Sequence, residues 1–337
     1  MNTVCESTMT SPQFDGVLFV GFGGPTPGCC ERFSPCPGNE AVCFVQAIIG
    51  ARPGAQSRLA EVAAHYTHLG GFSPFNALTV QQAHRVAALL EAQGWHMPVR
   101  VGMRYWPPYV RDVLREMADQ GLRHLLAVIL SPFQCTASWE AYQQVVTEGV
   151  AALGSQGPQV TYLAPWHMHP GFIEAIADTI RQASQPLGPA RAQDAALIYT
   201  AHAIPAAMAT GAPYTQQFAA TAAAAAQRLG RQDYCLAYQS QTTGTPFPWL
   251  QPDIHDAVQQ VQAAGYREVI VAPIGFLCDH VEVLYDLDIQ ARETALACGL
   301  TYRRAATVGT HRAFLAMLSE LLAERLRAGV GEAGDDG

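Results

Sequence analysis

Residues 16–22 read GVLFVGF, a run of aliphatic and aromatic side chains with glycine at the first and sixth positions. Similar aliphatic runs recur along the whole chain, namely VRVGM at 99–103, LLAVIL at 125–130, QVTYLA at 159–164, ALIYT at 196–200, CLAYQS at 235–240 and VIVAPIGF at 269–276. Short apolar runs of this kind are typical of strands that are buried on both faces of a sheet. We therefore expect a sheet protein whose strands lie mostly inside.

Helix-length segments with apolar residues at spacings of three and four separate these runs. The clearest of them are 78–90, 109–117, 173–180, 218–229 and 254–261. Because strands and helices alternate, the chain is predicted to be an α/β protein with parallel sheets. About eight such steps fit either one eightfold barrel or two doubly wound halves, and the pattern does not separate these folds.

The chain length indicates about two domains, since 337 residues are roughly twice a usual domain of about 150. The clearest interruption rich in proline, glycine and polar residues is SQPLGPARAQD at 184–194. We place the domain boundary near 160–190. The last ten residues, AGVGEAGDDG at 328–337, are rich in glycine and acidic residues, and we expect them, like residues 1–13, to be disordered.

Composition excludes several classes of protein. Only 14% of the residues are charged, against about 25% in an average soluble protein, so disorder and a coiled coil are both disfavoured. The chain has 20 Lys and Arg against 28 Asp and Glu, a net charge of -8, and it lacks the basic excess that a nucleic-acid partner requires. No apolar run approaches the roughly 20 residues of a membrane span. Residues 1–15 lack the features of a secretory signal, and we expect a cytoplasmic protein.

Polar side chains follow two of the predicted strands, at the edge where open α/β sheets bind their ligands. His202 lies just after the strand at 196–200, and the segment PIGFLCDHVE at 273–282 begins within the end of the last run. From there Glu282, Asp286 and Gln290 are spaced by four, so they share one face of a helix. An imidazole with carboxylates suits a divalent metal such as Fe or Zn, and it equally suits acid–base chemistry. A structural histidine and a solvated helix face are the alternatives.

Seven groups of residues then match a known family, in the family's order. They are GGP at 23–25, HY at 65–66 with GGFSP at 70–74, MRY at 103–105, AHAIP at 201–205, GAPY at 211–214, YQS at 238–240 with PWL at 248–250, and PIGF at 273–276 with DHVEVLYD at 279–286. In these motifs the chain resembles the ferrochelatases, which insert Fe2+ into a porphyrin in haem biosynthesis. The stretches at 65–76, 243–253 and 275–288 resemble most the bacterial branch that uses coproporphyrin III.

The resemblance implies two Rossmann-like domains, each a four-stranded parallel sheet flanked by helices. We expect these domains at 14–165 and 166–307, with a C-terminal helix at 311–327 that packs back on the first. The implied enzyme is a porphyrin metal chelatase, a lyase, with Fe2+ and coproporphyrin III as substrates and coproheme as product. Protoporphyrin IX as substrate, a cobalt or nickel chelatase of the same fold, and a non-catalytic haem or porphyrin carrier are the alternatives. The implied protein is a monomer in transient contact with other enzymes of haem synthesis.

The resemblance also implies roles for individual residues. His202 and Glu282 would be the catalytic pair, facing the porphyrin centre from opposite sides of a cleft, and with Asp286 they would be the metal ligands. The implied porphyrin contacts come from both halves of the chain and are Phe22, Tyr66, Ser73, Arg104, Tyr105, Thr136, Trp249 and Phe276. Aromatic members of this set would form an apolar slot, and polar members would contact propionates.

The cysteines depart from the family. Ferrochelatases with an iron–sulphur cluster use C-terminal cysteines, but no cysteine follows Cys298 in this chain. Instead, four cysteines lie just after the first predicted strand, at Cys29, Cys30, Cys36 and Cys43. Four thiolates suit a [2Fe-2S] cluster or a structural zinc ion, although adjacent cysteines are an uncommon ligand pair. Free buried or redox-sensitive thiols are the alternative.

Overall fold

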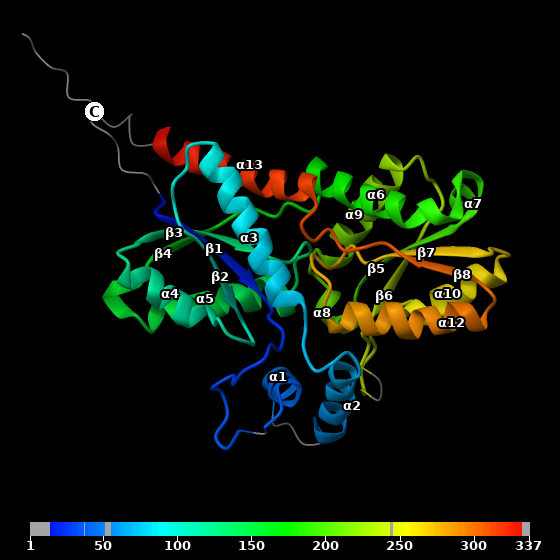
Figure 1. Ribbon diagram of the computed structural model, residues 1–337, viewed down its shortest axis with the longest axis horizontal. Coiled ribbons are helices and arrows are strands. Elements are labelled where there is room, and N and C mark those ends of the chain that lie inside the picture. Colours follow the sequence, from blue (N-terminus) through cyan, green and yellow to red (C-terminus); the bar gives the residue numbers. More distant parts are fainter. Residues whose placement is uncertain (1–13, 37, 51–54, 243–244, 332–337) are drawn as a thin grey trace, which may run out of the picture.

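The computed structural model describes residues 14–36, 38–50, 55–242 and 245–331. Its strands form two separate four-stranded parallel sheets that lie side by side, with helices packed on both faces of each (Figure 1). The predicted α/β class is therefore confirmed. Of the two folds that the pattern allowed, the structure has two doubly wound halves and no closed barrel.

The first sheet has the strand order β2-β1-β3-β4. Its strands are β1 (Gly16–Gly21), β2 (Val99–Met103), β3 (His124–Ile129) and β4 (Gln159–Tyr162). All six residues of β1 are buried, because β1 lies between β2 and β3 and both of its faces are covered by helices. The run GVLFVGF at 16–22 thus supplies a central strand of this sheet.

The second sheet has the corresponding order β6-β5-β7-β8. Its strands are β5 (Ala196–His202), β6 (Cys235–Gln239), β7 (Glu268–Ala272) and β8 (Thr301–Arg304). The run at 269–276 was predicted as one long strand, but β7 ends at Ala272 because Pro273 has no N–H to continue the ladder. The sequence pattern did not reveal β8, whose four residues are all half-buried at the edge of the sheet.

The five helices predicted from periodicity are present as α3 (Phe75–Ala92), α4 (Val110–Asp119), α6 (Pro170–Ser184), α9 (Tyr214–Arg228) and α10 (Ile254–Ala263). The other α-helices are α1 (Glu40–Ile49), α2 (Ala55–His68), α5 (Ala141–Ala151), α7 (Pro189–Asp194), α8 (Ala206–Ala209), α11 (Val281–Val283), α12 (Arg292–Ala297) and α13 (Arg312–Gly331). Two segments are π-helices, η1 (Thr136–Glu140) and η4 (Leu284–Ala291), and two are short 3-10 turns, η2 (Gly154–Gln156) and η3 (Gln185–Leu187).

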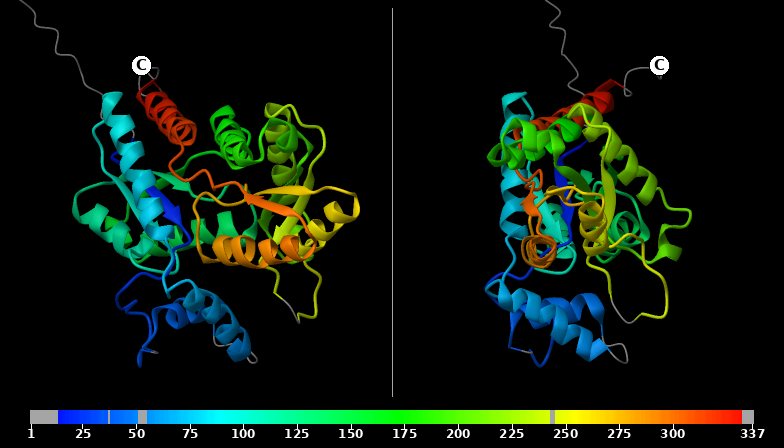
Figure 2. Two further views of the ribbon diagram at one scale, coloured as in Figure 1. Left: turned by 45° about the vertical axis from the view of Figure 1, so that its right-hand side comes forward. Right: turned by 90° about the vertical axis from the view of Figure 1, so that its right-hand side faces the viewer.

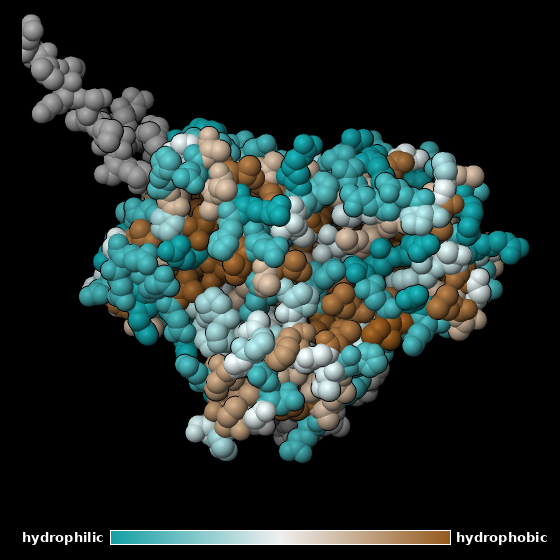
Figure 3. Space-filling view, viewed as in Figure 1, coloured by the Kyte–Doolittle hydropathy of each residue, from teal (hydrophilic) through white to brown (hydrophobic). Residues whose placement is uncertain are grey.

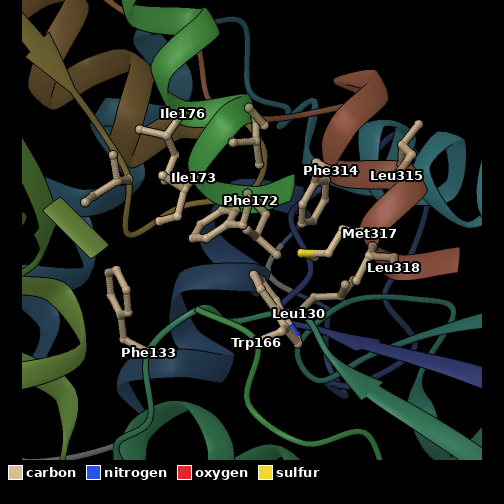
Figure 4. Close-up of a cluster of buried hydrophobic side chains, with 14 of the residues drawn as sticks. Leu130, Phe133, Trp166, Phe172, Ile173, Ile176, Phe314, Leu315, Met317 and Leu318 are labelled. Carbon is tan, nitrogen blue, oxygen red and sulfur yellow. The ribbon is translucent and has the colours of Figure 1, made fainter. Parts of the chain in front are cut away.

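One buried cluster extends through both halves of the molecule. It includes Phe19 of β1 and Tyr199 of β5, together with side chains of α3, α6, α9 and α13. At its centre, Phe172 of α6, Phe314 of α13 and Trp166 pack edge to face or tilted, with ring centroids 5.1 to 6.0 Å apart (Figure 4). Helix α13 packs against both α3 and α6. It extends to Gly331, so residues 328–331 of the predicted tail are helical, whereas 1–13 and 332–337 lie outside the described residues.

Helices α1 and α2 form a cap that lies outside the two sheet layers (Figures 1 and 2). The buried residues of this cap, among them Cys43, Phe44 and Tyr66, form one cluster with Trp106 after β2 and Val281 of α11. The cap therefore joins the two halves at the carboxyl ends of their sheets. The face shown in Figure 3 is mostly hydrophilic, with apolar side chains in small patches. None of the described helices has both the length and the apolar character that crossing a bilayer requires.

Candidate active site

The two strand-end segments that the sequence singled out meet at the carboxyl edge of the second sheet. His202 is the last residue of β5, and Glu282 lies in α11, after the turn that follows β7. Nε2 of His202 lies 3.5 Å from a carboxylate oxygen of Glu282. Their side chains are 37% and 31% exposed, so both are open to a ligand from one side. The predicted catalytic pair is thus brought into contact.

Two bonds hold His202 in position. Its Nδ1 contacts the carbonyl oxygen of Ala203, which can only accept a hydrogen bond, so Nδ1 carries a proton and Nε2 faces Glu282. The hydroxyl of Tyr214 in α9 donates to the backbone carbonyl of His202 at 2.8 Å. The imidazole therefore has one fixed orientation, with its second nitrogen directed into the site.

The pair shifts the pKa of each partner in the direction that favours charge. Burial opposes the imidazolium form, but the Glu282 carboxylate outweighs it and raises the pKa of His202 above its ordinary value. Burial alone would raise the pKa of Glu282, yet His202 and, at longer range, His280 and Arg58 lower it to about 2. Glu282 is consequently ionised throughout the neutral range. Burial lowers the pKa of the neighbouring His280, which favours its neutral form.

Asp286 lies one turn further along, in π-helix η4, and it is only 7% exposed. Burial, together with the charge of Glu282, raises its pKa to about 7. The hydroxyl of Ser240 donates to this carboxylate, and Ser240 has a left-handed backbone with φ of 64°. A non-glycine residue in this conformation is strained, and such strain is concentrated at functional sites.

Gln239 is a site residue that the sequence analysis did not single out. Its side-chain oxygen accepts a hydrogen bond from the hydroxyl of Thr200 at 2.9 Å. Its NH2 group therefore points the other way and donates to the backbone carbonyl of Glu282 at 3.4 Å. Gln239 and Thr200 are both fully buried. The position of Gln239 at the end of β6 was the available signal, because strand ends are where ligand-binding residues gather.

Arg304, at the end of β8, was also missed. Its guanidinium contacts both carboxylate oxygens of Asp279, at 3.1 and 3.2 Å, and both of Asp288, at 2.6 and 2.9 Å. Thr307 donates a further hydrogen bond to Asp279 at 3.1 Å. Asp279 precedes Glu282 and Asp288 follows Asp286, so Arg304 ties together the two ends of the segment that carries both carboxylates. The missed strand β8 explains why the sequence did not indicate this role.

The predicted aromatic porphyrin contacts lie in separate places. Phe22, just after β1, packs on Tyr105 with ring centroids 4.8 Å apart, and both belong to the cap cluster that includes Val281. Phe276 lies 6.3 Å from the His202 ring, and Trp249 is half-buried, with its Nε1 donating to Thr245. Two of these four aromatic residues thus lie on each half of the molecule.

The predicted polar contacts lie in different surroundings. Tyr66 is buried in α2, and burial raises its pKa well above its ordinary value. Ser73 is buried and packs so closely on Gly24 that a Cβ added to Gly24 would lie 2.6 Å from the Cβ of Ser73. The Ser73 hydroxyl accepts a hydrogen bond from the backbone N–H of Phe75, inside the turn. Arg104 donates to the carbonyl of Ala137, and Thr136 is exposed at the start of η1. Arg104 and Thr136 are accordingly the polar pair with room for a ligand.

The four loop cysteines are not in equivalent positions. Cys30 and Cys43 are buried, whereas Cys29 and Cys36 are exposed and accept backbone N–H groups of Glu31 and Gly38 at 3.3 and 3.4 Å. Burial and the adjacent thiols of Cys30 and Cys36 raise the pKa of Cys43 to about 12. Cys30 and Cys36 are therefore near enough to Cys43 to influence its thiol. Among the described residues, however, no three His, Cys, Asp or Glu side chains are placed to bind one metal ion, in this loop or around His202.

Comparison with known proteins identifies the family. The family model described as Ferrochelatase matches residues 15–326. The chain is 34% identical to a ferrochelatase of Rhodopirellula baltica, a match that covers 94% of this chain and 87% of that one. It is 34% identical to a coproporphyrin III ferrochelatase of Mycolicibacterium smegmatis, over 93% and 90% of the two chains, and 37% identical to one of Mycobacterium tuberculosis, over 94% and 87%.

Solved structures give the same fold at low identity. SirB of Bacillus subtilis with Fe3+ superposes with a TM-score of 0.52 at 10% identity, over 94% of this chain and 96% of that one. The cobalt complex of the sirohydrochlorin chelatase SirB from Bacillus subtilis subspecies spizizenii has a TM-score of 0.50 at 11% identity, over 95% and 97%. These likenesses show a chelatase fold and nothing of the substrate. With the family match over nearly the whole chain, the predicted resemblance is confirmed, and the chain belongs to the ferrochelatase family.

Proposed function

We propose that this chain inserts Fe2+ into coproporphyrin III to form coproheme, a step of haem biosynthesis. The observation that carries the proposal is the contact between His202 and Glu282, with the Phe276 ring beside the imidazole. Relatives at 34 to 37% identity that are named coproporphyrin III ferrochelatases support the choice of porphyrin. Phe22, Tyr105, Phe276 and Trp249 are the proposed walls of the slot, and Arg104 and Thr136 its proposed polar contacts.

The residues of the site suit the chemistry of metal insertion. Both pyrrole N–H protons must leave before four nitrogen lone pairs can bind Fe2+. Nε2 of His202 faces the site and accepts a proton, and the ionised Glu282 stabilises the imidazolium that results. Glu282 and Asp286 are one turn apart and lead from His202 toward Ser240, so they form a path by which protons leave the porphyrin. His202, Glu282 and Asp286 are also the proposed ligands for the incoming Fe2+, which would have to draw the three side chains closer together than they lie in this structure.

The test is an anaerobic assay of iron insertion with coproporphyrin III and protoporphyrin IX under matched conditions. We expect faster insertion into coproporphyrin III. We also expect His202→Ala to lose at least about 100-fold in rate, because it removes the proton acceptor, while free-base porphyrin binding changes little. Faster turnover of protoporphyrin IX would assign the chain to the other substrate. Porphyrin binding with no insertion by the wild type would make it a carrier.

We propose in addition that the loop of Cys29, Cys30, Cys36 and Cys43 binds a [2Fe-2S] cluster or a zinc ion. The nearness of Cys30 and Cys36 to Cys43 and the backbone N–H groups directed at the sulphurs of Cys29 and Cys36 support this assignment. A bound metal would stabilise the loop, since binding free energy that only the folded state gains adds to stability.

Metal content of protein purified without oxygen tests this second proposal. We expect about one site per chain, and we expect Cys36→Ser to lower both the metal content and the melting temperature. Cys298→Ser is the matched control, because Cys298 is half-buried and lies at the end of α12, away from the loop. If wild-type protein from iron- and zinc-replete cells contains no metal and is no more stable than Cys36→Ser, the four cysteines are free thiols.

A further inference from the structure

A tyrosine of the proposed slot wall has two guanidinium groups over its ring. Cζ of Arg104 lies 4.6 Å from the Tyr105 ring centroid, and Cζ of Arg32 lies 5.9 Å from it. Arg104 follows β2 and was expected from the sequence, but Arg32 belongs to the cysteine loop and was not. The two cations approach one aromatic ring from segments that are 72 residues apart in the chain.

Neither cation has a carboxylate partner among the residues that the structure describes. Within the described parts of the chain, no carboxylate forms an ion pair with Arg32 or Arg104, whereas the nearby Arg111 pairs with Asp112 at 3.3 Å. Arg32 is exposed, and the ring under it is half-buried. Arg104 donates one hydrogen bond to the carbonyl of Ala137. A guanidinium on an aromatic face keeps its remaining donors at its edge, in the geometry that binds a carboxylate with two parallel bonds.

The loop holds Arg32 at this place. The hydroxyl of Tyr109 donates to the backbone carbonyl of Cys30 at 2.8 Å, and the Cys30 side chain is buried in the cap cluster. Arg32, two residues on, also lies over the Tyr109 ring, with Cζ 5.3 Å from the centroid. A buried anchor and two aromatic rings therefore limit where the guanidinium can go.

The negative charge of the proposed porphyrin substrate suggests a function for Arg32 and Arg104. The protein has a net charge of -8, and the site already contains the carboxylates of Glu282 and Asp286. A porphyrin with four carboxylates needs cations at the rim of such a site. We propose that Arg32 is a substrate-binding residue, which with Arg104 receives a carboxylate of the porphyrin at the outer side of Tyr105. This inference rests on the proposed function, and it adds a specificity contact from the cysteine loop.

Equilibrium binding of free-base coproporphyrin III without metal, followed by fluorescence quenching, tests the role of Arg32 apart from catalysis. We expect Arg32→Gln to weaken binding about fivefold or more, because a charge-assisted contact is lost. Arg32→Lys should restore binding to within about twofold to threefold, since it retains the positive charge. Arg111→Gln is the matched control: Arg111 also lies over a tyrosine, with Cζ 5.2 Å from the Tyr109 centroid, but it is paired with Asp112.

The outcomes separate this inference from the proposed function. Wild-type affinity in Arg32→Gln, an equal loss in Arg111→Gln, or no binding of coproporphyrin III by the wild type would overturn the role of Arg32. If the wild type inserts iron while Arg32→Gln binds normally, only the role of Arg32 fails. If the expected pattern of binding is found but no iron is inserted, the role of Arg32 stands and the proposed activity fails. The melting temperature of each variant checks that the loop is still folded.

Discussion

Glu282 and Asp286 are carboxylates one turn apart, yet their surroundings shift their pKa values in opposite directions. The contact with His202 lowers the pKa of Glu282 to about 2. Asp286 is buried beside that negative charge, and its pKa rises from an ordinary value near 3.8 to about 7. Spacing alone makes the two residues look alike. Their difference comes from the neighbouring charges and from burial.

The raised pKa of Asp286 predicts a pH-dependent cost in stability. Between about pH 4 and pH 7 the unfolded chain has lost this proton while the folded protein keeps it, so the Asp286 contribution to stability falls as pH rises. Asp286→Asn removes this dependence. Relative to the wild type, the variant should gain about 3 to 4 kcal/mol in free energy of unfolding between pH 4 and pH 8. Urea unfolding of both proteins in metal-free buffer measures the gain.

The matched control for this experiment is Asp256→Asn, which removes an exposed carboxylate from α10. Its stability relative to the wild type should change little between the same pH values. If Asp286→Asn differed from the wild type by the same amount at pH 4 and at pH 8, the assignment of a raised pKa to Asp286 would be wrong.

The strand β8 contributes to the site through Arg304, although it lies at the edge of its sheet. Arg304 is 13% exposed and contacts Asp279 and Asp288. Arg304→Gln leaves both carboxylates without their cation, so we expect a loss of about 3 kcal/mol in free energy of unfolding. We also expect a slower rate of iron insertion, because the segment that carries Glu282 is no longer held at both ends.

Urea unfolding and the insertion assay check this prediction side by side. Arg228→Gln provides the comparison, since Arg228 is 55% exposed in its pair with Glu174 and should cost less than about 1 kcal/mol. A loss for Arg304→Gln no greater than that for Arg228→Gln, with an unchanged insertion rate, would mean that β8 does not position the site.

Across the entire protein, the two sheets share one core. Phe314 of α13 is fully buried against Trp166 and Phe172, in the cluster that reaches from β1 to β5. We therefore expect a single unfolding transition by calorimetry. Phe314→Ala should destabilise the protein by about 3 to 5 kcal/mol, the usual cost of removing a buried aromatic ring, and it should lower the midpoint of that one transition.

The exposed Leu296 of α12 supplies the control, since Leu296→Ala removes apolar volume at the surface and should change stability little. Two separate transitions in the wild type, of which Phe314→Ala shifts only one, would show instead that the halves unfold independently.

Elements with a local signal could be predicted from the amino-acid sequence alone. Continuous apolar runs indicated seven of the eight strands of the two sheets, and spacings of three and four indicated five helices, because burial on both faces and burial on one face leave different patterns. Strand-end polarity likewise indicated His202 and Glu282 as candidate site residues. The signal was weak for β8, whose Tyr302, Arg303 and Arg304 are half-buried at a sheet edge, and a four-residue edge strand has no long apolar run.

Contacts formed in the folded chain set how the site residues act on one another. The pKa values of Glu282 and Asp286, the orientation of the Gln239 amide and the ion pairs of Arg304 all depend on groups that are distant in sequence and close in space. The same is true of the raised pKa of Cys43 and of Arg32 over the Tyr105 ring. Desolvation depends on burial, and Coulomb interactions depend on the distance between charges. Burial and distance are both set by the folded structure and cannot be read from the order of residues along the chain.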